Sequence, residues 1–290
     1  MVVKSERTVS NYQVMLKRIR DAVAPGSTGL AFLENHGAIC NWIEAQPWSV
    51  NTRKAYYIAL KSTVRDSEDQ SLADAMKAYN DKMLQYAEQA EKQQASQEMT
   101  ERERKNFVRW PEILKAREKL RLSVSNFMEF QDYVIYCLYT LAPPVRVDYS
   151  PMEICETMEE AVVSTENCLV IGDGRWQFVF RNYKTASRYG TVVLDVTREL
   201  QEVLQEWLEY NPGRWLLCDA GGEPLTDKYL AKKIATVMER ATGRPIGASL
   251  LRHIYITHKR RGELPLKDQQ DMAKAQMHSI GMSQKYRKIN

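Results

Sequence analysis

The sequence predicts an α+β protein that is mostly helical, with an all-α lobe followed by a mixed lobe that holds a small antiparallel sheet. Through residues 1–90, apolar side chains recur three to four positions apart, the period of a helix face. Between residues 168 and 195, short β-type runs alternate with turn residues instead. The stretch 91–106 is polar and poor in apolar residues, which predicts a linker. We therefore expect one domain at 1–90 and a second at 107–290.

The first lobe is expected to contain four helices. Apolar residues at helical spacing predict the first two, over Thr8–Ala22 and Leu30–Ala45. Ser49 is a residue type that caps helix N-termini, so the third helix is expected to follow it over Thr52–Val64. A fourth amphipathic segment predicts a helix over Ser71–Ala90.

In the mixed lobe, the spacing of apolar residues changes twice along the chain. Helices come first, strands follow, and further helices complete the lobe. The strands are short and are separated by turn residues such as Gly172 and Gly174, which predicts one small antiparallel sheet. The expected elements are helices at Trp110–Leu120 and Ser125–Leu141, strands at Cys168–Ile171, Trp176–Phe180 and Thr191–Asp195, and helices at Glu199–Tyr210, Thr226–Ala241, Leu250–Arg261 and Pro265–Ala275.

The composition argues against several classes of protein. The five cysteines are scattered and form no Cys-x-x-Cys pair, so neither a zinc site nor a redox pair is indicated, and no metal site is expected. Scattered thiols favour an intracellular protein. The N-terminal residues lack the apolar run of a secretory signal, and the longest apolar run is too short for a membrane span.

The charge is small in total but unevenly distributed. The net charge is +4, from 41 Lys and Arg against 37 Asp and Glu. Residues 1–65 carry nine basic and four acidic side chains, residues 66–103 carry four and ten, and residues 230–290 carry thirteen and four. Two basic regions separated by an acidic one favour a protein that binds a polyanion with both ends. A chance distribution over solvated helices is the alternative.

Four short stretches of the second lobe carry side chains suited to phosphate chemistry. The first holds Arg146, directly after an apolar helix, and the second holds Lys184, in a turn between two predicted strands. The third holds Arg252 at the start of a late helix, and the fourth holds His278 and Tyr286. Each has an ordinary explanation when taken singly: a surface ion pair, a solvated lysine or a packed tyrosine.

Taken together, the order Arg, Lys, Arg, His-Ser and Tyr resembles that of the tyrosine recombinases, the DNA-cleaving and rejoining integrases and site-specific recombinases. The resemblance covers most of residues 105–290. Residues 251–257 resemble the family's Leu-Arg-His-x-x-x-Thr pattern, and residues 49–60 are similar to a helix of its core-binding domain. The residues around Arg146 and the Met-His-Ser sequence are most similar to variants from crypton-type mobile elements and large DNA viruses.

The resemblance implies a catalytic role for each residue. Arg146 and Arg252 would bind the non-bridging oxygens of the scissile phosphate. Tyr286 would attack the phosphorus and hold the DNA end as a 3′-phosphotyrosyl link. Lys184 would protonate the leaving 5′-oxygen, and His278 would hydrogen-bond the phosphate or stabilise its charge. This chemistry requires neither metal nor ATP, so no cofactor is expected.

The resemblance also implies partners. The all-α core-binding lobe and the catalytic lobe would close around double-stranded DNA as a clamp, and four protomers would assemble as a tetramer on two duplexes. The location would be the nucleus for a eukaryotic or viral protein and otherwise the cytoplasm, on DNA, with no membrane partner. Basic side chains expected to contact DNA are Arg53, Lys54, Lys61, Arg65, Lys259, Arg260 and Arg261.

The sequence departs from the family pattern at Ser249. The family has a histidine three residues before the second arginine, whereas a serine can donate a hydrogen bond but cannot act as a base near neutral pH. Ser249 stays among the candidate catalytic residues. His253 lies about 100° round the helix from Arg252, and we interpret it as buried support rather than a substitute base. Two alternatives remain open: a type IB topoisomerase, and a catalytically silent DNA-binding protein derived from a recombinase.

Overall fold

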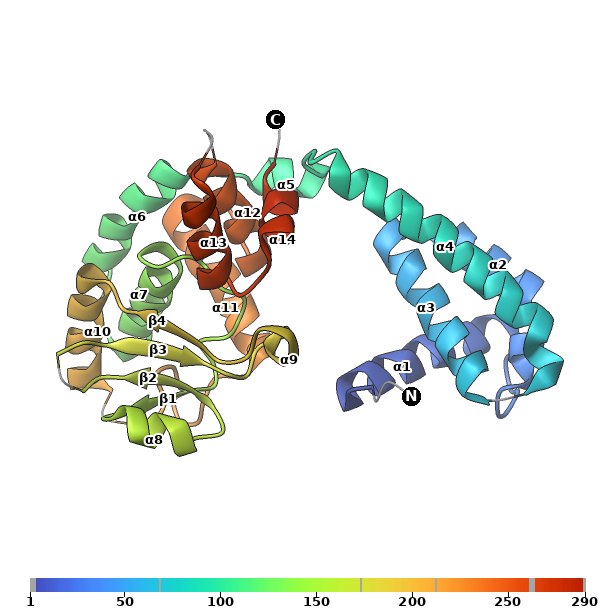
Figure 1. Ribbon diagram of the computed structural model, residues 1–290, viewed down its shortest axis with the longest axis horizontal. Coiled ribbons are helices and arrows are strands. Elements are labelled where there is room, and N and C mark those ends of the chain that lie inside the picture. Colours follow the sequence, from blue (N-terminus) through green and yellow to red (C-terminus); the bar gives the residue numbers. More distant parts are fainter. Residues whose placement is uncertain (1–3, 68, 173, 212, 261–263, 289–290) are drawn as a thin grey trace. The chain divides into compact units, whose positions relative to one another are not determined.

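The computed structural model in Figure 1 describes residues 4–67, 69–172, 174–211, 213–260 and 264–288. These residues are mostly helical and contain one four-stranded sheet, so the predicted α+β class is confirmed. The chain divides into two compact units, residues 1–96 and 97–290. Among the described residues, no helix is both long and apolar enough to cross a membrane.

The first unit is built from helices and two short 3₁₀ turns. Three of the four predicted helices are confirmed within a few residues, and the last of them continues past its predicted end to Ala95. The segment predicted as one helix over Leu30–Ala45 instead divides into a 3₁₀ turn and a helix that begins at His36. Its elements are α1 (Glu6–Val23), η1 (Ala31–Glu34), α2 (His36–Ala45), α3 (Val50–Ser67), η2 (Gln70–Leu72) and α4 (Ala73–Ala95).

Local capping and a shared core explain this unit. The Ser49 hydroxyl accepts a hydrogen bond from the Thr52 N–H at 3.2 Å, which is the predicted cap at the start of α3. Tyr57 on α3 and Tyr79 on α4 are fully buried in one apolar cluster. The Tyr79 hydroxyl donates to the Leu33 carbonyl at 2.8 Å, so its polar atom is satisfied inside the core.

The second unit begins with helices, continues through the sheet and ends with helices. The predicted helices and strands are confirmed within a few residues, and five further short elements, α5, β1, α8, α9 and α14, are added. Its elements are α5 (Glu101–Asn106), α6 (Trp110–Leu122), α7 (Phe127–Thr140), β1 (Met152–Cys155), α8 (Met158–Val163), β2 (Asn167–Val170), β3 (Gln177–Phe180), α9 (Ala186–Tyr189), β4 (Val192–Asp195), α10 (Arg198–Tyr210), α11 (Asp227–Thr242), α12 (Ala248–Lys259), α13 (Leu266–Ala275) and α14 (Ile280–Tyr286).

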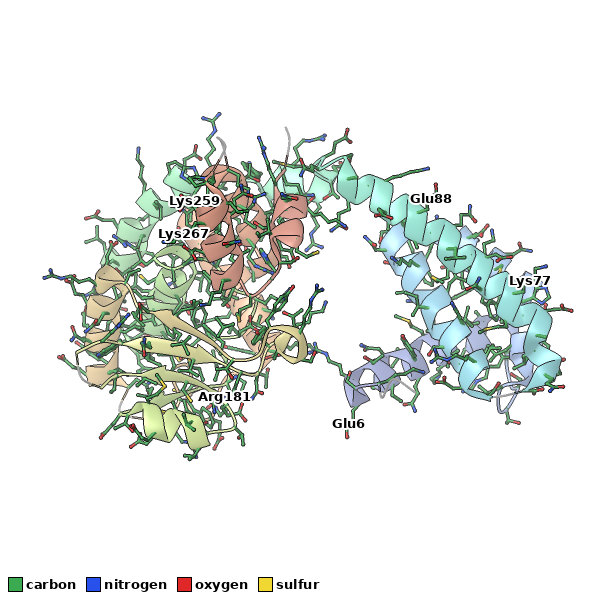
Figure 2. The ribbon with its side chains drawn as sticks, viewed as in Figure 1. Glu6, Lys77, Glu88, Arg181, Lys259 and Lys267 are labelled. Carbon is green, nitrogen blue, oxygen red and sulfur yellow. The ribbon has the colours of Figure 1, made fainter. Side chains whose placement is uncertain are left out.

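The sheet is mixed rather than purely antiparallel. Its order is β1-β2-β3-β4; β2, β3 and β4 pair antiparallel as predicted, but β1 pairs parallel with β2 through a connection that contains α8. β1 escaped prediction because it has four residues and includes Glu153, whose charge breaks the strand pattern. Arg181, at the end of β3, donates to the carbonyls of Val162 and Ser164 beside α8 (Figure 2).

The helix α7 forms the centre of this unit. Every residue from Phe130 to Thr140 is buried, and α6, α10 and α11 pack around the helix. A helix that is apolar on all sides belongs in a core, as its sequence predicts. The chain that leaves α7 reaches Arg146, whose carbonyl accepts a hydrogen bond from the buried Tyr139 hydroxyl. The first candidate catalytic arginine is thus anchored directly on the core.

Candidate active site

The side chain of Tyr286 lies among Arg252, His253 and His278. The guanidinium carbon of Arg252 is 4.9 Å from the centroid of the tyrosine ring. The ring centroid of His278 is 5.2 Å from that of Tyr286, and the centroid of His253 is 4.7 Å from it, both with an edge-on geometry. The half-buried phenol therefore contacts one cation and two imidazoles that come from α12 and from the segment before α14.

Arg252 is a buried cation with unused hydrogen-bonding capacity. Its side chain is on α12, and the residue is 2% exposed. Its Nη2 donates to the Gln276 carbonyl at 3.1 Å, while its Nε has no hydrogen-bond partner in the described part of the chain. Burial lowers the pKa of the guanidinium, an effect that Tyr286 opposes. Such a donor is suited to an anion, because a buried polar atom without a hydrogen-bond partner is costly.

Arg146 lies in the turn after α7, and its charge acts on Arg252 and His278. Its backbone N–H donates to the Asp148 carboxylate at 3.1 Å, and its buried Nη1 has no partner within the described residues. Burial raises the pKa of Asp148, whereas the hydrogen bond from Arg146 and the charges of both arginines oppose the rise. The charge of Arg146 also lowers the pKa values of Arg252 and His278, so the three side chains are electrostatic neighbours.

His278 is a buried, neutral histidine. The residue is 6% exposed, and burial together with the charges of Arg252 and Arg146 lowers the pKa of its imidazole to about 4. Its Nδ1 lies 3.2 Å from the Ser279 carbonyl, which fixes Nδ1 as the donor and leaves Nε2 as an acceptor. Nε2 has no partner in the described part of the structure. The ring can therefore accept a proton or a hydrogen bond beside Tyr286.

The lowered pKa of His278 predicts a specific dependence of stability on pH. Between the ordinary histidine pKa of about 6.5 and the folded value of about 4, the unfolded state binds a proton that the folded state does not. Stability is thus lost as the pH falls, and His278 should account for about 2 kcal/mol between pH 7 and pH 5. Urea unfolding of wild type and His278→Gln at both pH values measures this difference. Equal losses in the two proteins would contradict the assignment.

The end of α13 fixes the position of His278. The N–H groups of Met277 and His278 donate to the carbonyls of Lys274 and Ala273 at 2.9 and 3.1 Å, and Met277 has a φ of 54°. This is the Schellman arrangement, in which the left-handed position normally holds glycine. Here a buried methionine, 1% exposed, occupies it despite the steric cost. Backbone strain is thus stored next to the histidine.

Lys184 is exposed in the β3–β4 connection, just before α9. The next residue, Thr185, donates its hydroxyl to the Met277 carbonyl at 3.0 Å, which ties this connection to the segment of His278. The buried amide of Asn167 donates to the carbonyls of Asp148 and Asn182 at 2.8 and 3.0 Å. These two contacts place the backbone that carries Lys184 beside the segments of Arg146 and His278.

Ser249 and His253 differ in their relation to Tyr286. Ser249 is exposed in the first turn of α12, one turn before Arg252. His253 is half-buried, and its Nδ1 donates to the Tyr286 carbonyl at 2.9 Å. Burial lowers the pKa of His253, so its ring is neutral near pH 7. Its hydrogen bond goes to the backbone of the tyrosine, which agrees with a supporting role.

Gln276 is a site residue that the motif pattern does not reveal. It is fully buried; its carbonyl accepts from Arg252, and its Nε2 donates to the Pro144 carbonyl at 3.1 Å. It therefore connects the segments of both candidate arginines. Asn167 has the equivalent function between the Arg146 turn and the Lys184 connection. The only sequence signal for Gln276 is a polar residue close to the His-Ser motif.

Several basic residues proposed to contact DNA have partners within the protein. Arg53 donates to the carbonyls of Glu44 and Gln46 at 3.2 and 2.7 Å and thereby caps α2. Arg65 is exposed and pairs with Asp66 at 3.0 Å. Lys54 and Lys61 are half-buried on α3. Arg53 thus has a structural function that the charge pattern does not reveal.

The basic residues at the end of α12 also differ in their exposure and partners. Lys259 is exposed at the end of the helix (Figure 2). Arg260 is 8% exposed and donates to the Gln269 side chain at 2.6 Å, so it packs against α13. Arg261 lies outside the described residues.

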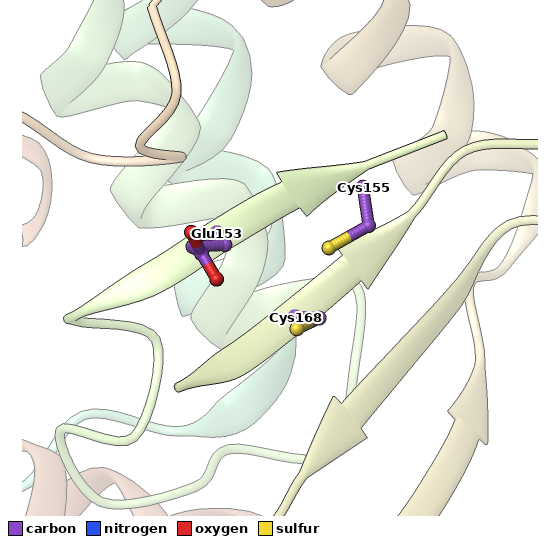
Figure 3. A group of neighbouring side chains, drawn as sticks. All are labelled: Glu153, Cys155 and Cys168. Carbon is purple, nitrogen blue, oxygen red and sulfur yellow. The ribbon is translucent and has the colours of Figure 1, made fainter. Parts of the chain in front are cut away.

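One group of side chains could hold a metal ion, although the cysteine spacing does not predict it. The ligand atoms of Glu153, Cys155 and Cys168 lie within 4.8 Å of one another on β1 and β2 (Figure 3). The Glu153 carboxylate already pairs with Arg214 and accepts from the Ser164 hydroxyl. Burial raises the pKa of the Cys155 thiol to about 12, which disfavours the thiolate that a metal requires. The donor set therefore fits a resident metal poorly.

No protein-family model and no curated protein matches the sequence. Solved structures do match the fold. A lambda integrase dimer bound to a COC′ core site aligns with 98% of this chain and 89% of its own, at a TM-score of 0.54 and 14% identity. A XerH site-specific recombinase bound to its difH substrate aligns with 97% and 76%, at 0.52 and 15% identity. At such low identity the likeness establishes architecture alone, and the protein has the fold of the tyrosine recombinases.

Proposed function

We propose that the protein is a site-specific DNA recombinase that cleaves and rejoins DNA strands through a 3′-phosphotyrosyl intermediate. The observation that carries this proposal is that Arg252 and His278 contact Tyr286, while the charge of Arg146 acts on both Arg252 and His278. Each of the three has a buried polar atom without a partner among the described residues. Buried polar atoms are normally satisfied, so this set is suited to bind a phosphate.

We infer an in-line displacement at phosphorus. The oxygen of Tyr286 forms a bond to phosphorus while the bond to the 5′-oxygen breaks. The phenolic proton passes to the Nε2 acceptor of His278, and Lys184 donates a proton to the leaving oxygen. Arg146 and Arg252 stabilise the charge that develops on the non-bridging oxygens. Rejoining is the reverse, with a 5′-hydroxyl as the nucleophile.

We propose double-stranded DNA with a specific recombination site as the partner, bound by the helical unit and the catalytic unit together, with self-association into a tetramer on DNA. The lambda integrase structure is bound to a COC′ core site, and the XerH structure is bound to its difH substrate. Exposed lysines such as Lys259 and the half-buried Lys54 and Lys61 would supply contacts to phosphates. Binding should therefore weaken steeply with salt. The protein would act inside the cell, on DNA.

The deciding experiment is a covalent-trapping assay on nicked suicide substrates. Because the target sequence is unknown, the substrates are duplexes of randomised sequence that each carry one nick at a fixed position. They are incubated with the protein, and the DNA in SDS-resistant protein–DNA complexes is sequenced. We expect complexes that carry one enriched sequence. The absence of any covalent species would contradict the proposal. Relaxation of a supercoiled plasmid without an enriched site would assign a type IB topoisomerase instead.

A second candidate is a catalytically silent DNA-binding protein. The observation that favours it is Ser249, which occupies the position of the family's histidine and is exposed. The trapping assay separates the two, because a silent protein retards DNA in a gel without attachment to it.

A further inference from the structure

Residues 97–103 contact the chain just before and just after the candidate nucleophile Tyr286. The Gln97 side chain donates to the Gln284 carbonyl within α14 at 2.7 Å. The Lys288 ammonium lies 3.1 Å from the Glu98 carbonyl and 3.1 Å from the Glu103 carboxylate. Contacts two residues before and two residues after Tyr286 thus reach the same short segment, which we name the joint segment (residues 97–103).

Glu103 is a fixed anchor within the joint segment. Its carboxylate accepts the Thr100 N–H at 2.9 Å, and its own N–H donates to the Thr100 hydroxyl at 3.2 Å, which together form a capping box. Burial alone would raise the pKa of Glu103, but the bonds from Thr100 and Lys288 outweigh it and lower the pKa. Glu103 is therefore ionised near neutral pH, and the capping box holds its side chain independently of Lys288.

The opposite side of the tyrosine segment rests on α12. His253 donates to the Tyr286 carbonyl at 2.9 Å, and the Lys288 N–H donates to the Thr257 hydroxyl at 2.9 Å. The residues around Tyr286 therefore lie between α12 and the joint segment. The side chains of Lys288 and Glu103 are 13% and 20% exposed, so their ion pair is shielded from water.

The helix that carries Tyr286 depends on such contacts because it is short. α14 has seven residues, which is below the length at which an isolated helix is stable in water. Its position relative to Arg252 is therefore set by tertiary contacts. Gln97 has a φ of 56° and is the first residue after the boundary of the helical unit, so the joint segment begins at a strained turn.

We propose that the joint segment positions the nucleophile: Gln97 and the Glu103–Lys288 pair hold Tyr286 against Arg252 and His278. The inference rests on the recombinase function proposed above. Glu103 and Lys288 are positioning residues, since they touch the tyrosine segment and not the reacting atoms. The rate of tyrosine attack thus depends on the chain that joins the two units.

The test compares attachment rate with DNA affinity in Lys288→Gln, Glu103→Gln and Gln97→Gly. On the trapped site at saturating DNA, we expect the single-turnover rate of covalent attachment to fall about tenfold or more, because small displacements of a reacting group are costly. The dissociation constant for the same DNA should change less than about twofold. The glycine variant permits the left-handed backbone and removes only the amide contact.

Controls separate this inference from the proposed function and from loss of folding. Lys92→Gln removes a comparable but exposed ion pair, with Glu88 on α4, and should attach at the wild-type rate. The double variant Glu103→Gln with Lys288→Gln should lose about as much rate as the more affected single variant, because either single change already breaks the pair. If wild type never attaches to DNA, the proposed function is wrong. If wild type attaches and all three variants match its rate, the positioning inference is overturned.

Discussion

Replacing Tyr286 by phenylalanine is expected to abolish covalent attachment to DNA and to leave DNA binding intact. The substitution removes only the hydroxyl, which is the proposed nucleophile. The ring keeps its edge-on contacts with His253 and His278 and its contact with the Arg252 guanidinium. This hydroxyl is the alcohol proposed to bond to phosphorus, so the loss should be complete rather than partial. SDS-gel detection of attachment on the trapped site measures it.

A second tyrosine provides the matched control for this experiment. Tyr229 lies on α11 and is 46% exposed, so Tyr229→Phe removes an exposed phenolic hydroxyl that has no proposed catalytic role. It should attach at the wild-type rate. Gel-shift affinity for Tyr286→Phe should match that of wild type, which shows that the fold and the DNA surface survive. Continued attachment by Tyr286→Phe would mean that another residue is the nucleophile.

The sequence predicted the elements whose signals are local. Periodicity found the helices, and Ser49 was recognised as a cap because its hydroxyl acts three residues away. The order of Arg146, Arg252, His278 and Tyr286 was visible in the motifs, and the structure brings these residues together. Their catalytic roles remain predictions, because side-chain geometry does not measure turnover.

Features that depend on contacts distant in sequence were not predictable. Gln276 contacts Pro144, which is far away in the chain, and only the fold makes that pair meet. Arg53 and Arg260 are predicted to contact DNA, and the structure adds bonds from them to Gln46 and Gln269 that charge alone does not predict. A basic side chain on a helix has the same sequence signature whether it caps a neighbour or faces solvent.

Replacing Arg252 by methionine is expected to lower the rate of DNA attachment strongly without lowering the stability of the protein. The guanidinium is buried against a carbonyl and a phenol ring, and its Nε lacks a partner in the described chain. An apolar side chain of similar size removes the desolvation cost of this buried charge, while Arg146 stays beside Asp148 as its cation. We therefore expect the free energy of unfolding of the methionine variant to stay equal or to rise, by about 1 kcal/mol.

The same substitution should reduce the single-turnover rate of attachment at least about 10³-fold, since loss of a single transition-state donor already costs about 10²–10³. Arg252→Lys is the intermediate control, because lysine keeps the positive charge but lacks the planar guanidinium. Its attachment rate should lie between those of wild type and Arg252→Met, and its free energy of unfolding should not rise. Urea unfolding and single-turnover trapping on the three proteins measure both quantities. A methionine variant that is both less stable and nearly as active as wild type would show that Arg252 is a structural residue. Opposite changes in the two quantities would instead indicate that the protein retains a destabilising buried cation because its phosphate chemistry requires one.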